Sequence, residues 1–341
     1  MDKFVLYYPE GHQAHQQIGH PERPERVEAI RDGLIELDIW QTAPQIKPLE
    51  LESSFIGTIH TPDYLQRLKQ ACVRGAMLDA DTYTTMESCQ LAFNAAGGTA
   101  AIAEAVWDKT NQTGFALSRP PGHHATQERG MGFCLINNIA VAAEYLLQYK
   151  GAKKLAIVDL DLHHGNGTQD IFWKRSDVSF CSIHQDPFYP GTGIINDSGS
   201  EEGEGYTMNL PIPSFSGDQA YLTLLHEIIF PYLGSTEPEM VLLSFGFDTH
   251  WKDPLGSMQV SAQCVHQMLK DLKEWVDQNC DGKLAVVLEG GYDLKAAKVS
   301  GQAIATALMD LVWQDSLGPS PIPEKDQWID TLNTARKLWG F

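Results

Sequence analysis

The sequence predicts an α/β fold in which a mostly parallel sheet lies between layers of helices. Short apolar runs that are typical of strands alternate along the chain with longer stretches of helical periodicity. The strand-like runs are apolar nearly throughout, which is expected when both faces of a strand are buried. No internal repeat or low-complexity linker interrupts the 341 residues, so we expect one domain over residues 1–341.

Helical periodicity predicts three helices in the first half of the chain, at 20–38, 91–107 and 137–149. Pro24 suits the first turn of the first helix, whose apolar residues form one stripe. The stripe consists of Val27, Ile30, Leu34 and Leu37. Near the end, a proline-rich stretch breaks the chain, and a short helix is expected to pack against the body through Trp328, Leu332 and Leu338.

Four predicted strands carry the functional argument, at 114–118, 154–160, 240–247 and 284–288. Each of them runs into a polar segment that contains Gly, Asp or His. Ligands of open α/β sheets bind outside the carboxyl ends of the strands. We therefore expect four separate stretches of sequence to deliver polar groups to one edge of the sheet.

The composition narrows the classes of partner. With 44 acidic and 25 basic residues the formal net charge is −19, which disfavours direct binding to nucleic acid. An acidic surface favours amines and basic peptides, although it also serves simple solubility. The six cysteines are scattered without a CxxC motif, which fits a reducing cytoplasm. No signal-peptide core and no apolar run of the ~20 residues that span a membrane are visible, so no membrane association is expected.

The second predicted strand leads into Asp159, Asp161 and His163, which alternate with leucines and therefore share one side of the strand. Two carboxylates and an imidazole cannot be buried together without a counter-charge, which a divalent cation supplies. A solvated Asp/His loop is the alternative. Asp248, which follows the third strand, is the natural third ligand. Three ligands with open positions are typical of catalytic zinc, and the two carboxylates make iron(II) a rival metal.

Two adjacent imidazoles, His123 and His124, follow a Pro-Pro-Gly turn after the first predicted strand. Beside a metal, such a pair can deprotonate an attacking water and protonate a leaving amine. Asp159 is placed to accept a hydrogen bond from one of them and so to fix its tautomer. After the fourth strand, two glycines permit close backbone approach, and the Tyr292 phenol can donate to an oxyanion. Taken alone, that last segment fits an ordinary turn equally well.

These segments together resemble the histone deacetylase and acetylpolyamine amidohydrolase family, which includes bacterial histone deacetylase-like amidohydrolases. The strings that carry the resemblance are HPERPER, RPPGHHA, GFCLINN, DLDLHHGNGTQDIF, PGTG, SFGFDTHWKDPLG and EGGYD. They occur in the family's order from about residue 20 to residue 292. The resemblance implies an arginase-like, three-layer fold with a central, mostly parallel sheet of eight strands, and the removal of acetyl or other acyl groups from amines.

The resemblance also implies individual roles. Zinc would be bound by Asp161, His163 and Asp248. His124 would be the principal general base and acid, with His123 as its partner, hydrogen-bonded to Asp159, while Tyr292 polarises the acyl carbonyl. The residues implied for the acyl-lysine channel, its mouth, its foot and the cavity beneath it are Gly132, Phe133, Phe188, Leu255, Cys134 and Arg26. Those implied for two structural potassium ions are Asp159, Asp161, His163, Ser182 and Ile183 for one, and Phe172, Arg175, Val178 and Tyr206 for the other.

Asn166 and Leu255 differ from residues found in other family members and bear on proton transfer and on the choice of substrate. Many family members pair the second histidine with an aspartate where this chain has Asn166, so we expect His124 to be less readily protonated here. Polyamine-selective members carry an acidic residue after an Asp-Pro pair at the channel mouth, where this chain has Leu255. The apolar residue favours acylated lysine in peptides and proteins over acetylated polyamines or related amides, which remain the alternative substrate class.

The sequence disfavours two other classes of protein. A binuclear manganese ureohydrolase needs Asp-x-His-x-Asp to bridge its metals, but Gly165 stands where the second aspartate would be. A catalytically inactive binding module is disfavoured because every position that the resemblance assigns to catalysis holds a competent residue. The sequence leaves the oligomeric state open.

Overall fold

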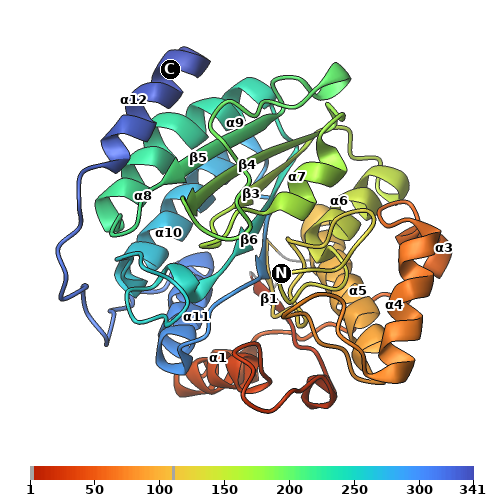
Figure 1. Ribbon diagram of the computed structural model, residues 1–341. Helices are drawn as coiled ribbons and strands as arrows, with labels where there is room; N and C mark the ends of the chain where they lie inside the picture. Colours follow the sequence, from red (N-terminus) through yellow and green to blue (C-terminus); the bar gives the residue numbers. More distant parts are fainter. Residues whose placement is uncertain (1–3, 110–111) are drawn as a thin grey trace.

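The centre of the molecule is one parallel sheet, described by a computed structural model that covers residues 4–109 and 112–341 (Figure 1). The strands are β1 Phe4–Tyr7, β2 Thr113–Ala116, β3 Leu155–Asp159, β4 Val178–Gln185, β5 Thr207–Ile212, β6 Met240–Phe245 and β7 Leu284–Leu288. They are arranged in the order β1-β2-β7-β6-β3-β4-β5, and every neighbouring pair is parallel. The four predicted strands are therefore β2, β7, β6 and β3, which are contiguous in the middle of the sheet.

The sheet of the described residues has seven strands, one fewer than the family resemblance implies. Beside β1, the segment at 44–46 runs parallel to Leu6 but pairs only through Gln45. Leu6 N–H donates to Pro44 O and Ile46 N–H donates to Leu6 O, both at 2.9 Å. Pro44 and Pro48 carry no N–H, so the ladder cannot extend in either direction.

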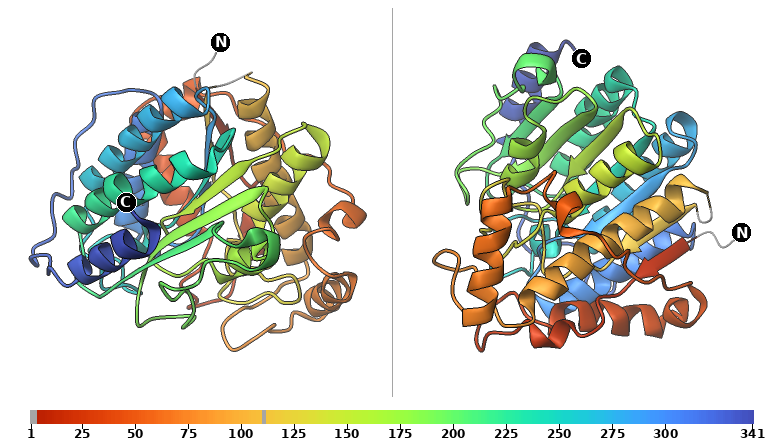
Figure 2. Two further views of the ribbon diagram at one scale, coloured as in Figure 1. Left: turned by 90° about the horizontal axis from the view of Figure 1, so that it is seen from above. Right: turned by 90° about the vertical axis from the view of Figure 1, so that its right-hand side faces the viewer.

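Helices cover both faces of the sheet (Figures 1 and 2). They are α1 Glu25–Glu36, α2 Ile39–Thr42, α3 Ser53–Ile56, α4 Pro62–Arg74, α5 Ser88–Trp107, α6 Asn138–Tyr149, α7 Asn166–Phe172, α8 Asp218–Leu224, α9 Phe230–Thr236, α10 Ala262–Asn279, α11 Leu294–Leu308 and α12 Trp328–Trp339. The apolar residues of α4, α5 and α6 pack on one face, and those of α1, α8, α10, α11 and α12 pack on the other. Successive residues of β1 alternate between the two cores, as the pleat of a strand requires.

The predicted helices exist with shifted ends. The one expected at 20–38 is α1, which begins only at Glu25, and Val27, Ile30 and Leu34 are buried as predicted. Leu37 does not belong to the stripe, because the helix ends at Glu36 and leaves Leu37 37% exposed. Asn137 is the N-cap of α6, since its side chain accepts a 3.1 Å hydrogen bond from the Ala140 N–H.

The C-terminal helix α12 packs against the body, as predicted. It does so through Trp328 and Leu332, which are buried, whereas Leu338 is 49% exposed and lies outside the contact. Within the part of the chain that the structure describes, no helix combines the length and apolar character needed to cross a membrane.

Candidate active site

The carboxyl ends of the four central strands bring the predicted polar segments together at one edge of the sheet. Asp161 and His163 follow β3, and Asp248 lies in a short 3₁₀ turn, Phe247–Thr249, directly after β6. One donor atom from each of the three lies within 4.8 Å of the others. His163 Nδ1 is 3.2 Å from Asp161 Oδ1 and 3.3 Å from Asp248 Oδ2.

These three side chains fit a divalent cation. Both carboxylates are fully buried, and Asp248 Oδ2 has no hydrogen-bond partner among the described residues. Burial, together with the charge of Asp161, raises the pKa of Asp248 to about 7. Two buried carboxylates that share one imidazole are costly unless a cation compensates them. The arrangement therefore matches a three-ligand site with open positions, as predicted for this cluster.

Two glycines make room for the cluster. A Cβ at Gly290 would lie 2.0 Å from Asp248 Oδ2, and a Cβ at Gly246 would lie 1.8 Å from Asp161 Oδ2. The Gly290 N–H also donates to Asp161 Oδ2 at 2.8 Å. Backbone that passes this close to both carboxylates holds them in place and excludes any larger residue.

The two histidines lie beside the cluster and differ in environment. His123 Nδ1 is 3.0 Å from Asp159 Oδ2, and the rings of His123 and His124 are 4.0 Å apart. Burial lowers the pKa of His123, but Asp159 and Asp161 outweigh burial and raise that pKa to about 10. Burial, reinforced by His123 and His163, holds the pKa of His124 well below its usual value. The hydrogen bond with Asn166 raises the pKa of His124, so burial and the two neighbouring imidazoles account for its low value.

Asn166 determines which nitrogen of His124 is free. Its Oδ1 is 2.7 Å from His124 Nδ1, and its Nδ2 donates to Met131 Sδ at 3.6 Å. The amide oxygen therefore faces the ring and accepts the Nδ1 proton. His124 Nε2 is left as the proton-accepting atom.

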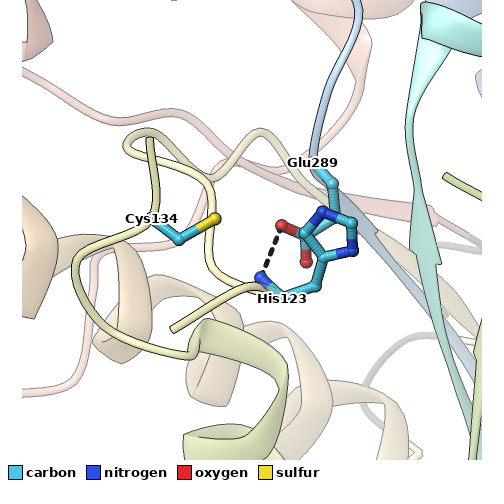
Figure 3. A group of neighbouring side chains, drawn as sticks. All are labelled: His123, Cys134 and Glu289. Atoms are coloured by element: carbon cyan, nitrogen blue, oxygen red, sulfur yellow. Dashed lines mark hydrogen bonds between the residues drawn. The ribbon is translucent and has the colours of Figure 1, made fainter. Parts of the chain in front are cut away.

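Glu289, to which the sequence analysis gave no role, fixes the turn that carries the histidine pair (Figure 3). Its Oε2 accepts hydrogen bonds from the N–H groups of Gly122 at 2.7 Å and His123 at 3.1 Å, and its Oε1 accepts from Ser244 Oγ at 2.8 Å. Glu289 also lies near Cys134, so that these two and His123 form a second cluster of potential metal donors. The Glu289 carboxylate already accepts three hydrogen bonds, and burial keeps the pKa of the Cys134 thiol well above normal. We therefore interpret this cluster as a support for the turn that carries His123 and His124.

Tyr292 follows β7 and is only 8% exposed. Burial holds the pKa of its phenol well above normal, so the phenol remains a hydrogen-bond donor. The Arg26 guanidinium lies 4.8 Å from the Tyr292 ring centre and donates to Gly291 O and Glu289 O, each at 2.5 Å. Asp253, which the sequence analysis also missed as a support, accepts the Tyr292 N–H at 2.5 Å through its Oδ2.

The candidate walls of the site include the predicted residues and one aromatic residue, Tyr189, that was not predicted. Gly132 and Phe133 both have left-handed backbones, with φ of 55° and 68°, and the Phe133 ring packs edge-on against Tyr292 at 5.7 Å. Phe188, the expected facing wall, stacks on the His163 ring at 5.4 Å. Its neighbour Tyr189 packs edge-on against His124 at 5.1 Å and lies beside Gly132. Tyr189 is therefore a further candidate wall residue. Phe188 and Tyr189 are adjacent in the sequence, so motif spacing alone did not show which of the two rings lines the site.

The remaining predicted residues are those of the channel mouth and of the two potassium positions. Leu255 and Tyr292 border a pocket of about 460 Å³ together with the loop at 16–21. Ser182 is the β4 partner of Asp159 in the strand register, with Ile183 next to it. The other expected set also lies in one region: Arg175 N–H donates to Phe172 O at 2.9 Å, and Phe180, two residues after Val178, donates to Tyr206 O at 2.8 Å.

The chain belongs to the histone deacetylase family, because the family model described as "Histone deacetylase domain" matches residues 20–308. A probable deacetylase of Archaeoglobus fulgidus is 37% identical over 295 residues, which are 86% of this chain and 82% of the relative. The histone deacetylase-like amidohydrolase of Pseudomonas aeruginosa is 34% identical over 85% of this chain and 77% of its own length. The crystal structure of the HDA15 HD domain superposes with a TM-score of 0.89 at 32% identity, covering 100% of this chain and 97% of that one.

Proposed function

We propose that this chain is a zinc-dependent amidohydrolase that removes acetyl or other acyl groups from lysine side chains of peptides and proteins. The observation that carries the proposal is the buried Asp248 Oδ2, which accepts no hydrogen bond from the described residues and lies 3.3 Å from His163 Nδ1 beside Asp161, with His124 packed against the His163 ring. Asp161, His163 and Asp248 would hold the metal, with iron(II) as the rival because two of the three ligands are carboxylates. Acyl amides are the substrates that membership of the deacetylase family suggests.

Each residue of the site has a task in amide hydrolysis. When bound, zinc would polarise the acyl carbonyl and increase the acidity of water. His124 takes the proton of the attacking water at Nε2, the nitrogen that Asn166 leaves free, and passes it to the leaving amine. His123, oriented by Asp159, stands next to this proton transfer. The Tyr292 phenol donates to the oxygen on which negative charge develops.

The walls favour a long, apolar acyl-amine stem. Gly132, Phe133 and Tyr189 offer backbone and aromatic surface beside the histidines, and Leu255 adds an apolar residue at the mouth. A second ammonium group, such as that of an acetylated polyamine, finds no carboxylate at position 255, and the carboxylate that does line this pocket is that of Glu25. Acylated lysine is therefore the first candidate substrate, and acetylated polyamines are the second because the net charge of −19 attracts any cationic amine.

A competition assay on protein stripped of metal and reloaded with zinc(II) or iron(II) tests the proposal. The kcat/KM values of acetyl-lysine peptides, longer acyl-lysine peptides and acetylputrescine are compared. We expect metal-dependent turnover and at least about a tenfold preference for a peptide, equivalent to about 1.4 kcal/mol. A preference for acetylputrescine would reverse the order of the two substrate classes. Absence of turnover of any amide by metal-loaded protein would refute the enzymatic proposal.

Three further assignments go with this function. The two potassium ions are proposed at the positions given above, and a melting temperature that is equal in potassium and tetramethylammonium chloride would contradict them. We propose a single deacetylase domain over residues 1–341, supported by the one sheet that both helical layers share. We propose the cytoplasm as the compartment, supported by six cysteines that are all free, and export of the chain from the cell would contradict it.

A further inference from the structure

A buried cluster of two arginines and one glutamate lies beneath the site. Its members are Glu22, in the loop before α1, Arg26, in the first turn of α1, and Arg119, just before the turn of the histidine pair. All three side chains are at most 1% exposed. We infer that Glu22 is a positioning residue that holds the His123–His124 turn and the Tyr292 loop in register with each other.

Arg119 links Glu22 to the histidine turn. Its Nε donates to Glu22 Oε1 at 2.7 Å and its Nη2 donates to Glu22 Oε2 at 3.0 Å, which is a bidentate pair. The remaining donors of Arg119 reach His12 O and His15 O, each at 2.6 Å. The backbone that leads into His123 is therefore clamped to the loop that contains Glu22.

Arg26 links the same carboxylate to the Tyr292 loop. Its Nη1 donates to Glu22 Oε1 at 3.1 Å, while its other donors grip the carbonyls of Glu289 and Gly291. Its guanidinium also lies over the Tyr292 ring. Since Glu289 binds the histidine turn through its side chain, the two loops are joined both through Glu22 and through Glu289.

The charges explain why a glutamate is needed at the centre. Burial raises the pKa of Glu22, but Arg119, His15 and Arg26 outweigh burial and lower that pKa to about 2. Burial also lowers the pKa of His15 to about 4, so His15 adds no charge near neutral pH. Two arginines and one carboxylate leave a single positive charge, and loss of the carboxylate would leave two buried guanidinium groups without an anion.

A Glu22→Gln variant tests the inference by amide hydrogen exchange. We expect faster exchange in both 119–125 and 289–293, because the amide carries no negative charge and its NH2 group cannot accept the hydrogen bond that Arg119 Nη2 donates to Glu22 Oε2. Glu239→Gln is the matched control: its carboxylate accepts the N–H groups of Lys153 and Lys154 at the opposite end of the sheet. If Glu22→Gln is as stable as Glu239→Gln and its amide hydrogen-exchange rates in either segment equal those of the wild type, the inference is overturned. If Glu22→Gln does not fold, Glu22→Asp is measured against the same criteria.

Kinetics provide the second test, which rests on the proposed function. Glu22→Gln is expected to lower kcat about 30- to 100-fold with KM changed less than about threefold, as for a misplacement of reacting groups by about 1 Å. In a Tyr292→Phe background, the decrease in kcat caused by Glu22→Gln should be at least about threefold smaller, because the Tyr292 phenol, one of the groups that Glu22 positions, is already absent. Fully additive losses would overturn the inference. A wild-type protein without amidase activity would refute the proposed function alone, since the exchange measurement does not depend on turnover.

Discussion

Gly290→Ala perturbs the candidate metal cluster without changing any of its ligands. Gly290 follows β7, and its φ is not in the left-handed region, so the backbone itself tolerates alanine. The added Cβ would lie 2.0 Å from Asp248 Oδ2 and 2.7 Å from Asp161 Oδ2, whereas ordinary contact begins near 3.4 Å. The Asp248 carboxylate therefore has to move by more than 1 Å.

That displacement is large compared with the tolerance of a metal site. Ligand distances in such sites are reproduced within about 0.2 Å, so a shift of this size removes Asp248 from the coordination sphere. Because repositioning a ligand through its surroundings costs about 10- to 100-fold in affinity, complete loss of one of three ligands should cost at least about 100-fold. The expected penalty is thus about 2.7 kcal/mol or more.

The assay is a zinc titration against a chromophoric chelator, accompanied by kcat/KM on an acetyl-lysine peptide. Gly234→Ala is the control, because Gly234 lies on the exposed side of α9 and a Cβ there meets nothing within 4 Å. The control should bind zinc like the wild type and gain about 0.5–1 kcal/mol of helix stability. A Gly290→Ala protein whose zinc affinity lies within about threefold of the wild type would refute the geometry on which the site is built.

Two further variants address proton transfer and substrate choice. Asn166→Asp places a carboxylate beside His124 Nδ1, and this negative charge stabilises the imidazolium and raises the pKa of His124. Because His124 must be neutral to act as a base, the acidic limb of the pH profile of kcat/KM should move up by about one to two pH units. A superimposable profile between pH 5 and 9, determined for both proteins, would contradict the role of Asn166. Leu255→Glu adds a carboxylate at position 255 to that of Glu25, which already lines the same pocket, so the ratio of kcat/KM for acetylputrescine to that for an acetyl-lysine peptide should rise about tenfold. An unaltered ratio would mean that Leu255 does not set the preference.

The sequence predicted the middle of the sheet better than its margins. Strands β2, β7, β6 and β3 are buried on both faces and are therefore almost continuous apolar runs. Strand β4 is just as buried, but it contains Ser179, Ser182 and His184, whose polar atoms find partners inside the protein. Strand β5 contains Asn209 and Pro211 and lies at one edge, where fewer ladder bonds are required. Those polar residues removed the pattern by which β4 and β5 would have been recognised.

The reacting groups of the site were equally visible in the sequence, because each follows a strand that points it at the same edge. The candidate metal donors, the histidine pair and Tyr292 all follow strands of the central sheet, as this rule predicts. Their supports were not predicted. The bond between Arg119 and Glu22 joins residues 97 apart, and that between Gly122 N–H and Glu289 spans 167 positions. No local pattern distinguishes such a buried glutamate from one on the surface.

The supports nevertheless share a physical feature that makes them recognisable in the structure. Glu22, Asp253 and Glu289 are buried carboxylates, and each accepts several hydrogen bonds, from guanidinium groups or from backbone N–H groups of the loops that carry the reacting residues. A buried charge persists only where the chain supplies that many donors. Because those donors belong to the loops themselves, displacing either loop would leave the buried carboxyl groups without the hydrogen bonds that stabilise them. The carboxylates therefore keep the loops in position before any substrate binds, which is the condition under which preorganised groups lower a barrier.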